Sequence, residues 1–363
     1  MEKLKRMAVA LSSLLLLVGC EQPKVVDDIR IVQALGYDYY DESHILGTIT
    51  TPIYAHTGGS GQVQATVDTF SVVSHIGRTL NTLLESRSEF PLEIGKLLVI
   101  LYGKDLAKGG LFPYIDVVNR NPDVGRTISL AVVDGRAETI LNHKFTTDQL
   151  VSAYLNDLIQ HNTKASFPKN NLHEFLYSYF GDGMDPFMPL LKLKQHHVEI
   201  EGIALFKGDN YVDYLPFEYA YPFKMMFESF NDGSYEVPIN RNHYMSITNI
   251  SSKVDYKVEN ASSNRPIIYI NVKEKGFLRE SSSTMQPKQN IKEIERIMER
   301  TLEREGNQIL EMLKKLGVDP LRLGDKVRSY DRGWSEEKWR AIYPHVTVKL
   351  DVRTTLAQTG IIE

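Results

Sequence analysis

The sequence contains almost no cysteine and, after its first 20 residues, no long apolar run. Its 363 residues include one cysteine, Cys20, and two tryptophans. A single thiol cannot form a disulfide within the chain, so ordinary packed cores must stabilise the fold. A membrane-spanning helix needs roughly 20 apolar residues in succession, and no segment after Cys20 provides them. These absences exclude a disulfide-rich scaffold and a bundle of membrane helices.

Clusters of one charge sign are also missing. The formal net charge is −4, and neither Lys nor Arg gathers into a basic patch along the chain. Nucleic-acid-binding proteins use clustered Lys and Arg to neutralise phosphates, so we expect no nucleic acid partner. No polybasic stretch follows Cys20, so attraction to anionic lipids would add little to membrane binding.

The first 20 residues are typical of a bacterial lipoprotein signal peptide. A start with three basic residues precedes an apolar stretch, Met7 to Val18, that is too short to span a bilayer. Leu17-Val18-Gly19-Cys20 resembles a lipobox, and the alternative is a secretory signal with an incidental cysteine. We expect removal of residues 1–19 and a diacylglycerol on Cys20, whose two acyl chains suffice for stable anchoring.

The N-terminal half alternates between apolar strands and helices. The run from Leu97 to Tyr102 predicts a strand buried on both faces, and Thr127 to Val133 predicts a second one. Helical potential from Leu106 to Asn119 between them fits a βαβ crossover. Thr146 to Gln149 matches a capping box before an amphipathic helix. Another helix is predicted from Asn171 to Phe180.

Strands then dominate the middle of the chain. Gly202 to Phe206 and Tyr211 to Leu215 are joined through Lys207-Gly208-Asp209-Asn210, which predicts a hairpin. Further strands are predicted over 244–250, 252–258 and 267–272.

A long amphipathic helix precedes the last strand. Its apolar stripe is interrupted at Gly306, and its charged residues, such as Glu299 and Glu303, are interpreted as a solvated face. Val346, Val348, Leu350 and Val352 alternate with polar residues, so we predict that the stripe packs on a sheet containing this strand. The stripe consists of Ile291, Ile294, Met298, Leu302, Ile309, Leu313 and Leu316.

Segregated strand-rich and helix-rich stretches favour an α+β fold over a doubly wound one. Removal of the signal would leave 344 residues with a net charge of −6, enough for several domains. We predict a multi-domain α+β protein with mixed sheets, flanking helices and a long helix packed on a sheet in its last domain. The domains expected are 20–190 (N-terminal, α+β), 191–255 (middle, strand-rich) and 256–363 (C-terminal, α+β).

A search for chemistry gives no candidate catalytic, cofactor-binding or metal-binding residues. His196 and His197 are adjacent, so on a strand they would point to opposite faces. Asp182 to Asp185 has too few oxygens for a calcium loop and predicts a turn. Gly58 to Gly61 matches neither a phosphate-binding loop nor a nucleophile elbow. We therefore expect no enzyme and no cofactor.

In the order of its motifs the chain resembles the Ger(x)C lipoproteins, the C subunits of nutrient germinant receptors in endospore-forming bacteria. The resemblance covers essentially the whole chain, but Glu21-Gln22-Pro23-Lys24 replaces the tryptophan-bearing start of many members. The residues that carry it are Leu17–Cys20, Ile31–Asp38, Glu93–Gly103, Leu106, Gly110, Asn119–Pro122, Glu201–Lys207, Trp339, Val346–Val348 and Gly360.

The resemblance implies a three-domain, non-enzymatic lipoprotein on the outer face of the spore inner membrane. There it would assemble with an A subunit and a permease-like B subunit to trigger germination. The alternative is a lipoprotein solute-binding protein of an ABC transporter, for which two α/β lobes around a pocket are expected. In the C-terminal domain, Trp334 and Trp339 are our candidates for a partner surface, because aromatic residues are enriched at interface cores.

Overall fold

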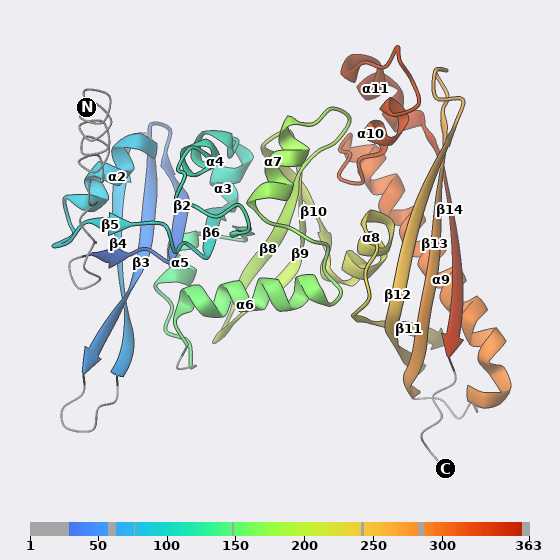
Figure 1. The fold of residues 1–363 in the computed structure, drawn as a ribbon, viewed down its shortest axis with the longest axis horizontal. Helices are drawn as coiled ribbons and strands as arrows, with labels where there is room; N and C mark the ends of the chain where they lie inside the picture. The colour runs from blue at the N-terminus through green and yellow to red at the C-terminus, as the bar shows by residue number, and fades with distance from the viewer. Residues whose placement is uncertain are drawn as a thin grey trace, which may run out of the picture.

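The computed structural model describes residues 29–56, 63–75, 77–146, 149–240, 243–281 and 287–357. An eight-stranded sheet, here the large sheet, and a four-stranded sheet, the small sheet, lie side by side along the longest axis of the molecule (Figure 1). Helices flank both sheets, which confirms a multi-domain α+β fold. The predicted signal peptide, Cys20, the Gly58–Gly61 loop and Gly360 lie outside the described residues.

The large sheet has a parallel centre and antiparallel edges. Strands β2, β6, β7 and β8 run parallel, and antiparallel strands extend the sheet on both sides in the order β10-β9-β8-β7-β6-β2-β3-β4. Every residue of β6 is buried, as the apolar run predicted. The strands are β2 (Ala34–Asp41), β3 (His44–His56), β4 (Val63–Ser74), β6 (Val99–Gly103), β7 (Ser129–Val133), β8 (Phe187–Lys194), β9 (His197–Lys207) and β10 (Asn210–Pro216), with β1 (Arg30–Ile31) and β5 (Leu92–Glu93) paired separately.

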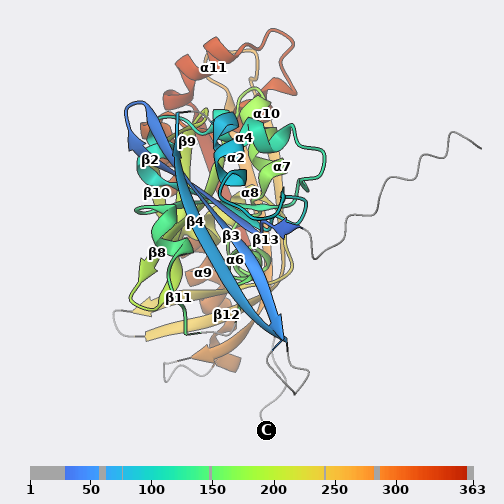
Figure 2. The ribbon, with the colours of Figure 1, turned by 90° about the vertical axis from the view of Figure 1, so that its left-hand side faces the viewer.

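Helices cover both faces of the large sheet. The core on one face contains α2 (Gly77–Glu85), α3 (Lys104–Lys108), α4 (Phe112–Asn119) and α7 (Leu172–Phe180). The core on the other face contains α5 (Ala137–Leu141) and α6 (Val151–Lys164). Figure 2 shows the long β3–β4 hairpin at the free edge of this sheet.

Two local predictions in this half need correction. The β6–β7 crossover holds two helices instead of one from 106 to 119, because Gly109-Gly110 interrupts the chain between α3 and α4. The capping box predicted at Thr146 to Gln149 does not cap α6. Leu150 is the N-cap, without a side-chain hydrogen bond, and the Gln149 amide donates instead to Asp157 at 2.6 Å. The predicted hairpin and the helix after Asn171 are confirmed.

The motif that ends in Asp38 has a clear structural role. Asp38 lies at the end of the parallel part of β2 and is 1% exposed. Its carboxylate accepts the backbone N–H groups of Ala137 at 2.7 Å and Glu138 at 2.9 Å. These are donors that the first turn of a helix leaves unpaired, so Asp38 fixes the start of α5 on the sheet.

The small sheet has the order β11-β12-β13-β14, and only its β13–β14 pair is parallel. The two strands predicted over 244–250 and 252–258 form a single strand, β12, with a register shift between Asn249 and Ser251. The elements are η2 (Phe217–Tyr219), α8 (Ala220–Phe227), β11 (Ser234–Asn240), β12 (His243–Glu259), β13 (Ile267–Ser281), α9 (Pro287–Leu316), α10 (Leu323–Arg328), α11 (Glu336–Ile342), η3 (Tyr343–His345) and β14 (Thr347–Ala357).

The predicted packing of the long helix is confirmed. Along the stripe of α9, Ile294, Met298, Leu302, Ile309 and Leu313 are each at most 2% exposed, and they share one core with β13 and β14. Gly306 is a point of close approach, not a defect in the stripe. A Cβ atom there would lie 2.3 Å from Leu350 Cδ2, so a larger residue would push α9 away from the sheet.

The interpretation of the charged side of α9 as a solvated face is wrong for one row of glutamates. Carboxylates at 295, 299 and 303 accept the backbone N–H groups of β14 residues 356, 354 and 352, at 2.9, 2.9 and 3.1 Å. Four helical residues rise about 6 Å and two strand residues about 6.6 Å, so the repeats match. The row protects the outer edge of the small sheet, where an unpaired strand could otherwise recruit another chain.

The domain boundaries expected at 190 and 255 both fall inside strands. Residue 190 lies in β8, which pairs with β7 on one side and β9 on the other, and residue 255 lies in β12. Backbone hydrogen bonds continue across both positions.

Replacement of Leu302 by alanine tests the α9 packing. Leu302 is 0% exposed, so we expect Leu302→Ala to lower the free energy of unfolding by roughly 2–5 kcal/mol. Urea denaturation of the chain from residue 21 onward measures it. Arg300→Ala, on the exposed side of the same helix, is the control and should change stability by less than about 0.5 kcal/mol. Equal effects of the two changes would contradict the packing.

Candidate functional site at the junction of the two sheets

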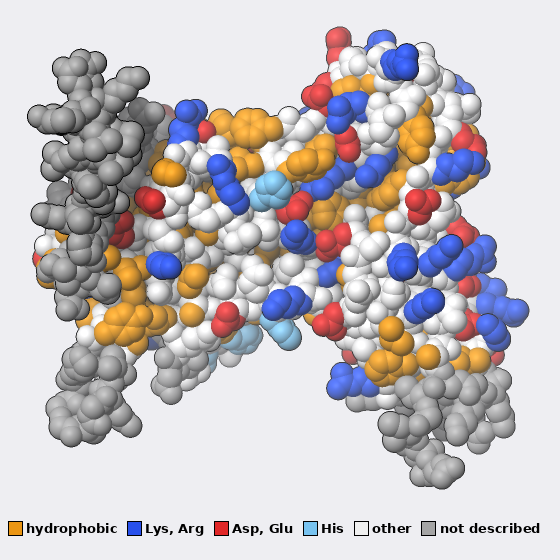
Figure 3. Space-filling model, viewed as in Figure 1, with side chains coloured by type: hydrophobic (Ala, Val, Ile, Leu, Met, Phe, Trp, Pro, Cys, Tyr) orange, Lys and Arg blue, Asp and Glu red, His pale blue; other side chains and the backbone are white. Residues whose placement is uncertain are grey.

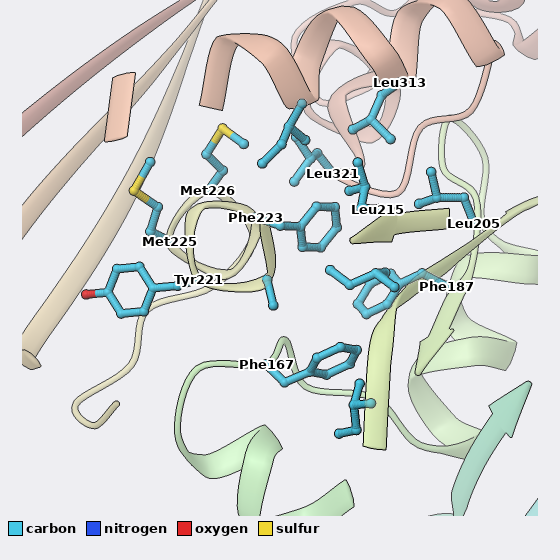
Figure 4. Close-up of a cluster of buried hydrophobic side chains, with 14 of the residues drawn as sticks. Phe167, Phe187, Leu205, Leu215, Tyr221, Phe223, Met225, Met226, Leu313 and Leu321 are labelled. Atoms are coloured by element: carbon cyan, nitrogen blue, oxygen red, sulfur yellow. The ribbon is translucent and has the colours of Figure 1, made fainter. Parts of the chain in front are cut away.

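Helix α8 fills the space between the two sheets. Phe223 points toward Phe187 of the large sheet, with ring centroids 5.3 Å apart, while Tyr221 and Met225 point toward the small sheet (Figure 4). The cluster of buried side chains around α8 includes residues of both sheets and of α9. The two halves therefore share one continuous core.

A buried carboxylate, Asp185, connects the halves beside this core. It precedes β8 and is 1% exposed. Arg340 of α11 donates to its two oxygens at 2.5 and 3.1 Å. The backbone N–H groups of Asp319 and Gly208 also donate to it, at 2.8 and 3.1 Å. These contacts compensate a charge that would be costly to bury alone.

Asp319, whose backbone N–H donates to Asp185, carries a second buried carboxylate. It is 0% exposed and accepts the N–H groups of Leu323 at 2.9 Å, Gly324 at 2.8 Å and the Trp339 indole at 3.2 Å. Burial, with a smaller effect of the neighbouring Asp185 carboxylate, raises the pKa of Asp319 to about 7, whereas the backbone N–H donors and Arg340 favour its charged form. Because each of these contacts is a donor, the geometry suits a carboxylate.

The backbones of the two halves also touch. Gly183, with φ of +68°, would place a Cβ atom 2.5 Å from the carbonyl carbon of Gly324. Its N–H donates to Glu336 at 2.7 Å, and its carbonyl accepts from Asp325 N–H at 3.1 Å. The Asp182–Asp185 segment forms the predicted turn, but its larger role is this contact. We call Asp185, Asp319, Arg340, Gly183, Gly324 and Glu336 the clasp.

Arg322 adds a third connection. It has a left-handed backbone, with φ of 62°, and its guanidinium lies 4.8 Å from the ring centroids of both Tyr177 and Phe227. It donates to Glu174 at 2.8 Å and to Ser178 at 3.2 Å, both on α7. Nothing in the local sequence pattern marks Arg322 or the clasp, because their partners lie far away along the chain.

The prediction of a partner surface is wrong for one of the two tryptophans, Trp339. Trp339 is 1% exposed, and its ring packs on Tyr343 with centroids 5.4 Å apart. Its indole N–H donates to Asp319. Trp339 is therefore part of the core beside the clasp and offers no surface to a partner. Trp334 is half-buried against the same core, and its role as a contact stays a prediction.

On another side of the junction lies a hollow of about 780 Å³. The waist between the two halves is visible as a notch in the space-filling view (Figure 3). Tyr221 and Tyr235 stack in the hollow with centroids 5.1 Å apart, and Tyr235 donates to Glu305 of α9. Both of these rings are buried, and the lining also includes Tyr219, Glu218 and Glu236.

The histidines considered earlier are both exposed. His196 and His197 lie at the β8–β9 turn. Within the described ranges no group of three or more Cys, His, Asp or Glu side chains could hold a metal ion.

Comparison with known families matches both halves in order. A family model described as "Spore germination protein N-terminal domain" matches residues 22–193. A second, "Spore germination B3/GerAC like, C-terminal", matches residues 201–360. The chain belongs to the GerAC-like spore germination family. The resemblance to Ger(x)C proteins is thereby confirmed.

Relatives of this GerAC-like chain are similar over almost their whole length. The spore germination protein GerQC of Bacillus cereus is 29% identical over 99% of this chain and 100% of its own. YfkR of Bacillus subtilis (strain 168), also named for spore germination, is 22% identical over 96% and 94%. The crystal structure of GerBC shares the fold, with a TM-score of 0.58, 18% identity, and coverage of 89% of this chain and 96% of GerBC.

The clasp joins the two family domains of this GerAC-like chain. Asp185 belongs to the N-terminal family match, and Asp319 and Arg340 belong to the C-terminal one. The gap between the two matches falls at the β8–β9 turn, inside the large sheet. The family domains are therefore interlocked by strand pairing as well as by the clasp.

Asp185→Ala tests the clasp. It would leave Arg340 and the N–H of Asp319 without their buried partner, so we expect a loss of roughly 3–5 kcal/mol in the free energy of unfolding. Asp182→Ala, in the same turn but exposed, is the matched control and should unfold like the wild type. Thermal and urea unfolding measure both variants. An Asp185→Ala protein as stable as the control would remove the clasp from this account.

Proposed function

We propose that this chain is the C subunit of a spore nutrient germinant receptor and that it acts without catalysis. The observation that carries the proposal is the match of both family domains, in order, over nearly the whole chain. The junction supports a binding role, because its buried charges serve each other and its hollow presents aromatic and carboxylate side chains.

Membrane attachment in this proposal depends on Cys20. No helix in the described part of the chain is long and apolar enough to cross a membrane. A diacylglycerol on Cys20 would hold the folded part on the outer face of the spore inner membrane. The lipobox Leu17–Cys20 supports this location, and each buried methylene contributes about 0.8 kcal/mol.

The partners proposed are an A subunit and a permease-like B subunit. Trp334 is our candidate contact residue for them, because an aromatic side chain that is only half-buried can add to an interface core. Tyr330 lies in the same loop and is 60% exposed, which makes it a matched aromatic for comparison.

The solute-binding alternative has less support from the fold. Ligands of open α/β sheets bind outside the carboxyl ends of the parallel strands. Here that edge is occupied by a chain of ion pairs: Lys104 to Asp134 at 3.0 Å, Asp134 to Lys192 at 2.8 Å, and Lys192 to Glu201 at 2.8 Å. The small sheet with its single long helix also differs from a second α/β lobe.

Cys20→Ala tests the anchor. The variant should accumulate as an unprocessed or soluble precursor, because no thiol remains to accept the lipid. Membrane fractionation and labelling with radioactive palmitate measure the outcome, with the wild type as the control. Membrane-bound Cys20→Ala protein together with an unlabelled wild type would refute the lipoprotein assignment.

Trp334→Ala tests the partner surface in spores that lack the native gene. We expect normal folding, weaker co-purification with the A and B subunits, and slower nutrient-triggered release of dipicolinic acid. Tyr330→Ala should behave like the wild type. Wild-type assembly by Trp334→Ala would place the interface elsewhere.

A deletion strain that germinates normally on every nutrient tested would overturn the proposed function itself. A wild-type chain that co-purifies with a transporter ATPase would also overturn it.

A further inference from the structure

Two histidines from distant parts of the sequence meet at one end of the large sheet. His44 is the first residue of β3, and His75 directly follows the last residue of β4. Ile45 pairs with Ser74 across the two strands, so the histidines occupy neighbouring places just beyond that pair. Their rings lie 3.9 Å apart between centroids, and their Nε2 atoms are 3.1 Å apart.

The Nδ1 atom of each ring lies within hydrogen-bond distance of an oxygen that can only accept. His44 Nδ1 lies 2.7 and 2.9 Å from the two carboxylate oxygens of Asp41. It also lies 2.9 Å from the Ser43 hydroxyl, whose own proton goes to Asp41. His75 Nδ1 lies 3.0 Å from the backbone carbonyl oxygen of Ser43. Each Nδ1 therefore carries the ring proton and donates it.

This assignment leaves both Nε2 nitrogens as acceptors. A neutral imidazole has one N–H and one lone pair, so each Nε2 atom carries a lone pair. The two Nε2 atoms are 3.1 Å apart and the tilted rings lie side by side with centroids 3.9 Å apart, so both lone pairs leave the pair on the same side. Neither can donate to the other, and the contact is repulsive unless a cation lies between them. Two neighbouring imidazole nitrogens with free lone pairs are donors that suit zinc, copper and nickel ions.

The surroundings hold the rings in this orientation. Asp41 is itself fixed, because its Oδ1 accepts the Ser43 N–H at 2.9 Å and the Ser43 hydroxyl at 3.1 Å. Metal-binding histidines almost always donate their other N–H to a carboxylate or a backbone carbonyl. His44 and His75 show one of each.

We propose that His44 and His75 bind one divalent transition-metal ion, such as Zn²⁺, through their Nε2 atoms. Two nitrogens each about 2.0–2.1 Å from zinc stand about 3.3 Å apart at a tetrahedral angle and about 2.9 Å apart at a right angle. The observed 3.1 Å lies between these values. A hollow of about 260 Å³ beside the rings, also lined by Glu42 and Asp105, has room for water to complete the coordination.

Calorimetric titration of the mature lipidated chain with Zn²⁺, in detergent and without a polyhistidine tag, tests the proposal. The wild type should bind one Zn²⁺ per chain. His44→Gln and His75→Gln should each remove this binding, and Asp41→Asn should weaken it by about 10- to 100-fold. The matched control is His196→Gln/His197→Gln, which removes the other exposed histidine pair and should bind like the wild type.

Thermal unfolding of each variant establishes that the fold is kept, which is expected because both rings lie at the surface. Zn²⁺ binding that survives in the His44→Gln/His75→Gln double variant would overturn the proposal. A wild type that binds no Zn²⁺ at a large molar excess would also overturn it. In that case a proton shared by the two Nε2 atoms would account for their short distance.

Discussion

Two neighbouring buried carboxylates, Asp185 and Asp319, constrain how the halves of this protein meet. They are 1% and 0% exposed, and a buried charge without partners costs several kcal/mol. Asp185 obtains its cation, Arg340, and one N–H donor from the C-terminal half. Each half therefore supplies hydrogen-bond partners for buried polar groups of the other. These contacts fix the relative position of the two sheets.

Charged side chains connect distant parts of this chain, whose single cysteine cannot form a disulfide within it. The clasp joins the family domains, Arg322 ties α10 to α7, and the glutamate row of α9 protects the free edge of β14. Each uses carboxylates that accept N–H groups at hydrogen-bond distance, which are stronger contacts than exposed ion pairs. The protein thereby presents fixed surfaces, as expected for a subunit whose proposed role is to bind and not to catalyse.

The sequence was informative where structure depends on local periodicity. The buried strand near Leu101, the hairpin after Phe206 and the stripe around Leu302 follow from alternation and helical spacing. The clasp could not be predicted, because Asp185 and Arg340 are separated by 155 positions. Gly306 resembled a flaw for the same reason: its neighbour Leu350 comes from another element. Trp339 was wrongly predicted at a partner surface, because the sequence does not show that its indole donates a hydrogen bond to the buried Asp319 carboxylate.

The central claim is that the junction makes the two family domains one rigid body. Ser86 and Arg300 are exposed, one on each half. Spin labels attached after Ser86→Cys and Arg300→Cys would measure this in the chain from residue 21 onward, which has no other thiol. Pulsed electron resonance should give one narrow distance distribution, broadened when Asp185→Ala is added. A broad or double distribution in the otherwise wild-type chain would contradict the account.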